Sequence, residues 1–276
     1  GEWDQKSCGY KDEKVWTAGT NDSSANIDVL LLNAGLVPGD ELTKSADGLE
    51  LSFAASVVGH HVLTMRLLQA GLLDGGRIVI AGSEAANNDL PAMFGMAVYD
   101  FITGDESRFG DSPEAAMRAF VRGEKSALYD GTRTYSTTKV FSAWWSASVA
   151  RRFGDRVSVF TVSPGSNMST NAARNVTGFN RFLFTKVMPA IGPLMGMDQP
   201  VSAGAGRYLE VLHDTAGRFN NGRTYTSAPR KMVGPLHEVG YAHIGDVARQ
   251  KAAWTVLQEV TGAALPLENL GREEVA

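Results

Sequence analysis

Tyr135 and Lys139 stand four residues apart in a stretch whose apolar residues suit a helix. On a helix, residues four apart share a face, so the phenol and the ammonium would lie close together. A neighbouring cation favours the phenolate and lowers the tyrosine pKa from its ordinary value of about 10. Tyr135 would then exchange a proton with a substrate near neutral pH. The alternative is a surface pair that has no function.

Three apolar segments of strand length precede or follow this stretch, at residues 27–32, 77–83 and 157–162. Such continuous apolar runs are typical of parallel strands that are buried on both faces. Helices are predicted between and after them, over 48–73, 113–122, 135–153, 200–212 and 246–260. Asp246 is the candidate N-cap of the last of these helices. Strands that alternate with helices predict an α/β fold with a doubly wound parallel sheet.

Small and polar residues stand where each predicted strand ends. They are Asn33–Ala34–Gly35 after the first strand, Ser83 at the end of the second, and Pro164–Gly165 after the third. Ligands of doubly wound sheets bind beyond the carboxyl ends of the strands. We therefore expect these residues to line one site together with Tyr135.

In this order, Asn-Ala-Gly, Ser, Tyr-x-x-x-Lys and Pro-Gly strongly resemble the motifs of the short-chain dehydrogenase/reductase family. The resemblance runs from about Ile27 to the C-terminus. It implies a Rossmann-like fold and hydride transfer between NAD or NADP and a small carbonyl or alcohol substrate. By that analogy Tyr135 is the general acid/base, Lys139 binds the nicotinamide ribose and lowers the Tyr135 pKa, and Ser83 polarises the substrate carbonyl.

The resemblance also implies which residues bind the cofactor. Alignment puts Ser56 where many family members carry an asparagine that holds a water for proton relay, so Ser56 joins the predicted catalytic residues. The residues expected to bind the cofactor are Asn33, Ala34, Gly35, Tyr135, Lys139, Pro164, Gly165, Ser166, Ser169 and Thr170.

The spacer between Ser83 and Tyr135, residues 84–134, is longer than the version common in the family. It resembles the subset related to retinol dehydrogenases and light-dependent protochlorophyllide reductases. That subset tends toward NADP and apolar substrates, so NADP is slightly favoured over NAD. Both ends of the spacer are anchored at the predicted site, so we expect it to cover the substrate.

The family begins with a strand, a glycine-rich turn and a helix whose N-terminus holds the pyrophosphate. No such motif precedes Ile27, and residues 1–26 are polar, irregular and too few for the missing βα units. We therefore expect an N-terminally truncated sheet, with residues 27–276 as one α/β domain. The alternative function is a catalytically inactive scaffold that acts as a binding or interaction module.

Composition limits the remaining classes. A net charge of −4 gives no basic surface for nucleic acid, and no apolar run of membrane-spanning length is evident. The single cysteine, Cys8, excludes an intrachain disulfide and favours a reducing, cytoplasmic setting. The histidines lack metal-ligand spacing, so no metal is expected. Trp144–Trp145 is interpreted as core packing or as a subunit contact, which leaves a homo-oligomer open.

Overall fold

A computed structural model describes residues 26–92, 95–167, 192 and 196–262. The expected irregular segment 1–26 therefore lies outside the described residues except for its last residue. At the centre is a five-stranded sheet in the order β1-β2-β3-β4-β5, whose first four strands are parallel and whose last is antiparallel. The strands are β1 (Val29–Leu32), β2 (Arg77–Ala81), β3 (Ser158–Val162), β4 (Thr224–Thr226) and β5 (His237–Glu238). The predicted α/β class is confirmed.

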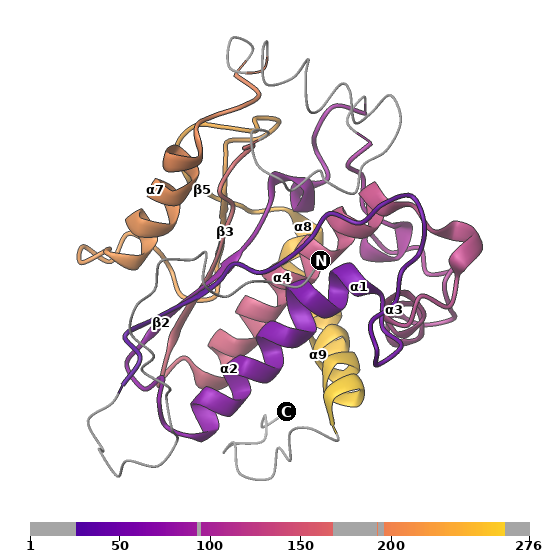
Figure 1. Cartoon of the computed structure of the whole chain (residues 1–276), viewed down its shortest axis with the longest axis horizontal. Coiled ribbons are helices and arrows are strands. Elements are labelled where there is room, and N and C mark those ends of the chain that lie inside the picture. Colours follow the sequence, from indigo (N-terminus) through magenta and orange to yellow (C-terminus); the bar gives the residue numbers. More distant parts are fainter. Residues whose placement is uncertain (1–25, 93–94, 168–191, 193–195, 263–276) are drawn as a thin grey trace, which may run out of the picture.

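Helices cover both faces of this sheet (Figure 1). One face packs on α2 (Gly59–Gln69) and α4 (Gly131–Phe153), and the other packs on α7 (Val201–Leu212). Helix α9 (Val247–Thr261) packs against α4. Side chains alternate along β2, so Ile78 and Ile80 join the larger core while Val79 joins the α7 core. The remaining helices are α1 (Leu51–Phe53), α3 (Pro113–Val121) and α8 (Ala242–Gly245).

Side-chain caps set the starts of the helices that flank the site. Asp130 accepts a hydrogen bond from Arg133 N at 2.9 Å and so begins α4 one turn before Tyr135. Asp246, the predicted N-cap, accepts from Arg249 N at 3.1 Å and begins α9. The helix predicted over 135–153 therefore begins earlier, at Gly131, because the cap lies upstream of the apolar stretch.

The first strand differs from its sequence-based prediction. Leu32 is buried, but Val29 is 43% exposed and Leu31 is 42% exposed. In the described part of the chain, β1 pairs with β2 alone and forms an edge of the sheet. The prediction of burial on both faces is therefore wrong for this strand, because a strand's burial depends on its neighbours as well as on its own residues.

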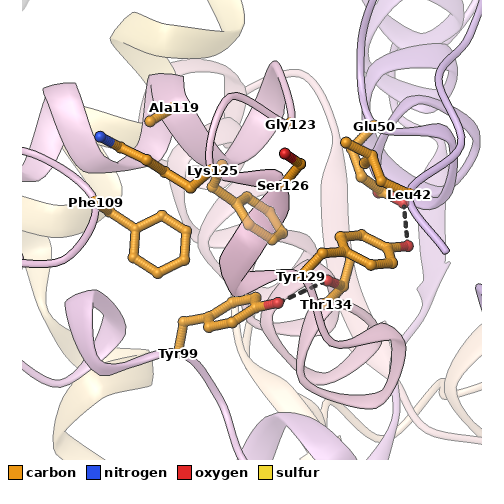
Figure 2. A pocket seen from close by; sticks show the side chains of 11 residues that line it. Leu42, Glu50, Tyr99, Phe109, Ala119, Gly123, Lys125, Ser126, Tyr129 and Thr134 are labelled. Atoms are coloured by element: carbon orange, nitrogen blue, oxygen red, sulfur yellow. Dashed lines mark hydrogen bonds between the residues drawn. The ribbon is translucent and has the colours of Figure 1, made fainter. Parts of the chain in front are cut away.

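Residues 95–128 of the long spacer pack into the protein. Tyr99, Phe101, Phe109 and Phe120 are buried, with ring centroids 4.9 to 6.2 Å apart. Figure 2 shows Tyr99 and Phe109 of this cluster, and the Tyr99 hydroxyl lies 3.1 Å from the Thr134 hydroxyl, within hydrogen-bonding distance. This part of the spacer therefore contributes to the core. That the spacer also covers the substrate stays a prediction.

The helical stretch Leu51–Gln69 is 19 residues long and is apolar enough to pass a length-and-composition test for a membrane span. The expectation that no such run exists is wrong by that test. Half of the tested window is buried inside the protein, which is also true of a core helix in a water-soluble fold. Trp144 and Trp145 are both buried in the core, so their interpretation as packing residues is confirmed and that as a subunit contact is wrong.

Candidate active site

The predicted residues gather at the carboxyl ends of β1, β2 and β3, beside the first half of α4. Ser83 lies two residues beyond β2, and α4 carries Tyr135 and Lys139. Gly35 follows β1, and Pro164 follows β3. These are the strand ends at which ligands of doubly wound sheets bind.

Tyr135 forms a hydrogen bond with Ser83, which connects the α4 phenol to the end of β2. Burial raises the pKa of Tyr135, and the Ser83 hydrogen bond opposes this with a smaller effect. The expectation that Lys139 lowers the Tyr135 pKa is wrong for this structure. The reason is that burial dominates, while Lys139 Nζ lies 5.7 Å from the centre of the Tyr135 ring.

Lys139 is a buried cation with one hydrogen bond among the described residues. Its Nζ donates to the carbonyl oxygen of Ala81 at 2.7 Å. Burial lowers the pKa of Lys139 to about 8. An ammonium carries three donors, so this group retains hydrogen-bonding capacity inside the protein.

Ser56 and Gly35 lie next to this ammonium. A Cβ atom placed on Gly35 would lie 2.9 Å from Ser56 Oγ and 3.9 Å from Lys139 Nζ. Ser56 belongs to a π-helical turn, η2 (Ala54–Val58), and its buried Oγ has no hydrogen-bond partner within the described ranges. Such turns occur often at functional sites. The structure therefore brings the aligned Ser56 to Lys139, while Asn33 and Ala34 lie exposed beyond β1.

His60 is a buried residue in the same neighbourhood. Its Nδ1 has no hydrogen-bond partner in the described structure. Burial, with a smaller contribution from the Lys139 charge, lowers the pKa of His60 to about 4. His61 instead accepts a hydrogen bond from Trp145 Nε1 at 3.2 Å and packs against Trp254, as expected of a core histidine.

The segment after β3 turns sharply at Gly165, whose φ of +75° is a conformation that glycine adopts without strain. Gly165 N donates to Ser163 Oγ at 3.0 Å, and Ser166 N donates to the Met232 carbonyl at 2.8 Å. Pro164, Gly165 and Ser166 are therefore held at the sheet edge. Ser169 and Thr170 lie outside the described residues.

Sequence reasoning missed a buried ion pair beside this edge. Glu84 immediately follows Ser83, and its Oε1 lies 3.0 Å from Arg207 Nη1 of α7. Both side chains are 5% exposed. Two signals were present in the sequence: a carboxylate directly after an apolar strand, and an arginine on the apolar helix 201–212. Neither signal indicates that Glu84 and Arg207 are partners.

The described residues fit the nicotinamide-ribose part of a dinucleotide. The observation that carries this fit is the buried ammonium of Lys139, which has donors left for hydroxyl acceptors. Tyr135 and the tightly turned Pro164–Gly165 segment lie at the same sheet edge. No residue in the described ranges supplies the glycine-rich turn that would hold a pyrophosphate.

Comparison with known proteins gives a curated sequence match and a solved structure of similar fold. No protein-family model matches the chain. The chain is 29% identical over 171 residues to a WW domain-containing oxidoreductase from Drosophila melanogaster, and the match covers 60% of the chain and 35% of that protein. The chain thus spans about a third of the length of this relative.

Among solved structures, an uncharacterised protein from Mycobacterium paratuberculosis has a TM-score of 0.54 at 18% identity. The comparison covers 87% of this chain and 69% of that one, and shows a shared fold. A short chain dehydrogenase from Salmonella enterica has a TM-score of 0.43 at 17% identity over 72% of this chain and 62% of that one.

In its ordered motifs and parallel sheet the chain is similar to the short-chain dehydrogenase/reductase family, and its curated relative is named as an oxidoreductase.

Proposed function

We propose that the protein is an NAD(P)-dependent oxidoreductase that transfers a hydride between the nicotinamide cofactor and a small carbonyl or alcohol substrate. The observation that carries the proposal is the convergence of Ser83, Tyr135 and Lys139 at one sheet edge, with Ser83 and Tyr135 hydrogen-bonded. The oxidoreductase match from Drosophila supports the same reaction class. The long spacer 84–134 favours NADP and an apolar substrate, by resemblance.

In this proposal each side chain has a separate task. Ser83 Oγ donates a hydrogen bond to the substrate carbonyl oxygen and fixes its position. Tyr135 gives its phenolic proton to the same oxygen, and the Lys139 ammonium uses its remaining donors to bind the ribose hydroxyls of the cofactor. The bound cofactor supplies the hydride.

The raised pKa of Tyr135 sets the protonation state in which the side chain meets a substrate. Because burial dominates, Tyr135 keeps its proton at neutral pH. A protonated phenol is ready to donate, as carbonyl reduction requires.

Cofactor binding tests the proposal directly. NADPH and NADH are titrated into the protein while their fluorescence is followed, and turnover is then assayed with aldehydes and ketones of increasing apolar length. We expect binding of at least one cofactor, tighter for NADPH, and turnover that Tyr135→Phe removes. Absence of both binding and turnover would contradict the proposal and favour a catalytically inactive binding module. A cytoplasmic location and a homo-oligomeric state are further proposals, open to cell fractionation and light scattering.

A further inference from the structure

The buried pair of Glu84 and Arg207 belongs to a fully bonded network that connects three strand ends. Glu84 Oε1 accepts hydrogen bonds from Ser227 N at 3.1 Å and Ser227 Oγ at 2.8 Å, and its Oε2 accepts from Ser163 Oγ at 2.5 Å. Arg207 Nη1 donates to the Ser163 carbonyl at 3.1 Å. Its Nη2 donates to Ser227 Oγ at 2.7 Å and to the Gly234 carbonyl at 2.6 Å.

The network touches both parts of the chain that would frame a bound substrate and cofactor. Glu84 is the residue after Ser83, whose Oγ begins the short helix η3 (Glu84–Asn87) by accepting from Ala85 N at 3.2 Å. On the other side, a Cβ on Gly165 would lie 2.9 Å from Arg207 Nη1, so the turn after β3 packs directly on the guanidinium. The pair therefore fixes the spacing between the Ser83 and Gly165 segments.

Stability alone is a weak reason for such a pair. Removing two charges from water costs about as much as their mutual attraction returns, and apolar replacements of similar volume are often as stable. A buried pair does, however, fix one geometry, because its planar donors and carboxylate oxygens match in few orientations. That property is useful where two segments must keep a set separation.

We infer that Glu84 and Arg207 are positioning residues that hold Ser83 and the Pro164–Gly165 turn at a fixed separation across the site. Neither residue touches the reacting atoms. They act through the backbone of their neighbours. The inference rests on the proposed function for its catalytic consequence, while its structural consequence stands independently.

The test compares this pair with a second ion pair that lies outside the site. Arg249 and Glu106 lie 2.5 Å apart, with side chains 11% and 18% exposed, and connect α9 to the long spacer. Glu84→Gln is measured against Glu106→Gln, since each removes one charge and keeps the side-chain shape. Arg207→Lys keeps the charge at the first pair but loses the planar fork.

Amide hydrogen exchange is the first measurement, made at a temperature at which every variant is folded. We expect Glu84→Gln to raise exchange at residues 83–87 and 163–167 together, and Glu106→Gln to leave both ranges unchanged. Unchanged exchange at these ranges in Glu84→Gln would overturn the inference. If Glu84→Gln does not fold, Arg207→Lys is compared with Glu106→Gln instead. Raised exchange at residues 83–87 and 163–167 in Arg207→Lys would then support the inference, and unchanged exchange would overturn it.

Turnover is the second measurement. A small misplacement of reacting groups costs up to about 10²-fold in rate, so we expect kcat/KM to fall by about that factor in Glu84→Gln and by less than twofold in Glu106→Gln. Equal losses of kcat/KM in the two variants would mean that the Glu84–Arg207 pair contributes only packing, and would overturn its role in catalysis. A wild-type protein that neither binds cofactor nor turns over substrate would refute the proposed function, and hydrogen exchange would still decide the positioning role.

Discussion

Two buried polar regions flank the same sheet edge and differ in how their hydrogen-bonding groups are used. The paired cluster, made of Glu84, Ser163, Arg207 and Ser227, satisfies both of its charges with several short contacts. The open cluster is made of Ser56, His60 and Lys139. It contains two buried atoms that have no partner among the described residues, and an ammonium with one bond.

The difference distinguishes a cluster that holds the fold together from a cluster that can bind a ligand. Buried polar groups are normally hydrogen-bonded, and each exception needs a reason such as an ordered water or a ligand. The paired cluster needs nothing more from outside the protein. The open cluster keeps donors and acceptors available, at a cost in stability, at the place where the ribose of a cofactor is proposed to bind. Variants of the two clusters should therefore change stability in opposite directions.

The largest effect is expected at Tyr135, which lies between the two clusters. Tyr135→Phe removes one hydroxyl and should lower turnover by about 10²–10⁴-fold, the usual contribution of general acid–base catalysis. The melting temperature should change little, because the ring remains. Steady-state kinetics and circular dichroism check the two parts. Near wild-type turnover in a folded variant would remove Tyr135 from the mechanism.

In the paired cluster, Arg207→Met should destabilise the protein by about 3–5 kcal/mol, because Glu84 is left as a buried charge without its partner. The control is Arg118→Met. Arg118 binds Glu259 at 2.8 Å through side chains that are 37% and 38% exposed. Loss of that exposed pair should lower the free energy of unfolding by less than about 1 kcal/mol. Urea unfolding measures both, and equal losses would contradict the distinction between the pairs.

In the open cluster, Lys139→Met should instead stabilise the protein. The folded protein lowers the pKa of Lys139 from 10.5 to about 8, so the charged ammonium costs stability at every pH below about 8. This cost is at most about 3 kcal/mol, and it shrinks as pH rises from 8 toward 10.5. We expect a more stable variant at pH 7 that binds cofactor poorly, with a stability gain that narrows by pH 9.5. A destabilised variant would contradict this account of the cluster.

Acid should destabilise the protein through its buried histidines. The pKa values of His60 and His61 fall from 6.5 to about 4, so the unfolded chain binds protons that the folded protein does not. Above pH 6.5 both histidines are neutral in the folded and the unfolded protein, and they do not lower the free energy of unfolding. As the pH falls from 6.5 toward 4, the free energy of unfolding decreases by up to about 3 kcal/mol per histidine. His61→Asn, which can still accept from Trp145, should flatten part of this dependence. Unfolding titrations from pH 7 to pH 4 measure it.

The smallest effect concerns the exposed side of β1, the strand that leads to the open cluster. An apolar edge strand favours association between molecules, and a lysine on it opposes pairing. Leu31→Lys should therefore reduce self-association while changing stability by less than about 0.5 kcal/mol. The control is Leu32→Lys, which places a charge at a buried position and should unfold the protein. Light scattering and thermal unfolding separate the two results.

The sequence by itself was enough to predict the α/β pattern, because runs of apolar residues and helical spacing are local properties. The resemblance also led us to expect Ser83 beside Tyr135 and Lys139, and the structure brings Tyr135 next to Ser83; their joint role in one active site stays a prediction. The N-cap of α9 at Asp246 followed from the same kind of local chemistry.

The tertiary structure alone decided what depends on neighbours far apart in the chain. Glu84 and Arg207 are 123 residues apart, and no local pattern pairs them. Burial, which raises the pKa of Tyr135 against the expected effect of Lys139, is set by the surrounding elements. The exposure of β1 and the antiparallel β5 follow from strand order. Local sequence fixes what a segment can form, whereas charge, burial and pairing depend on what packs beside it.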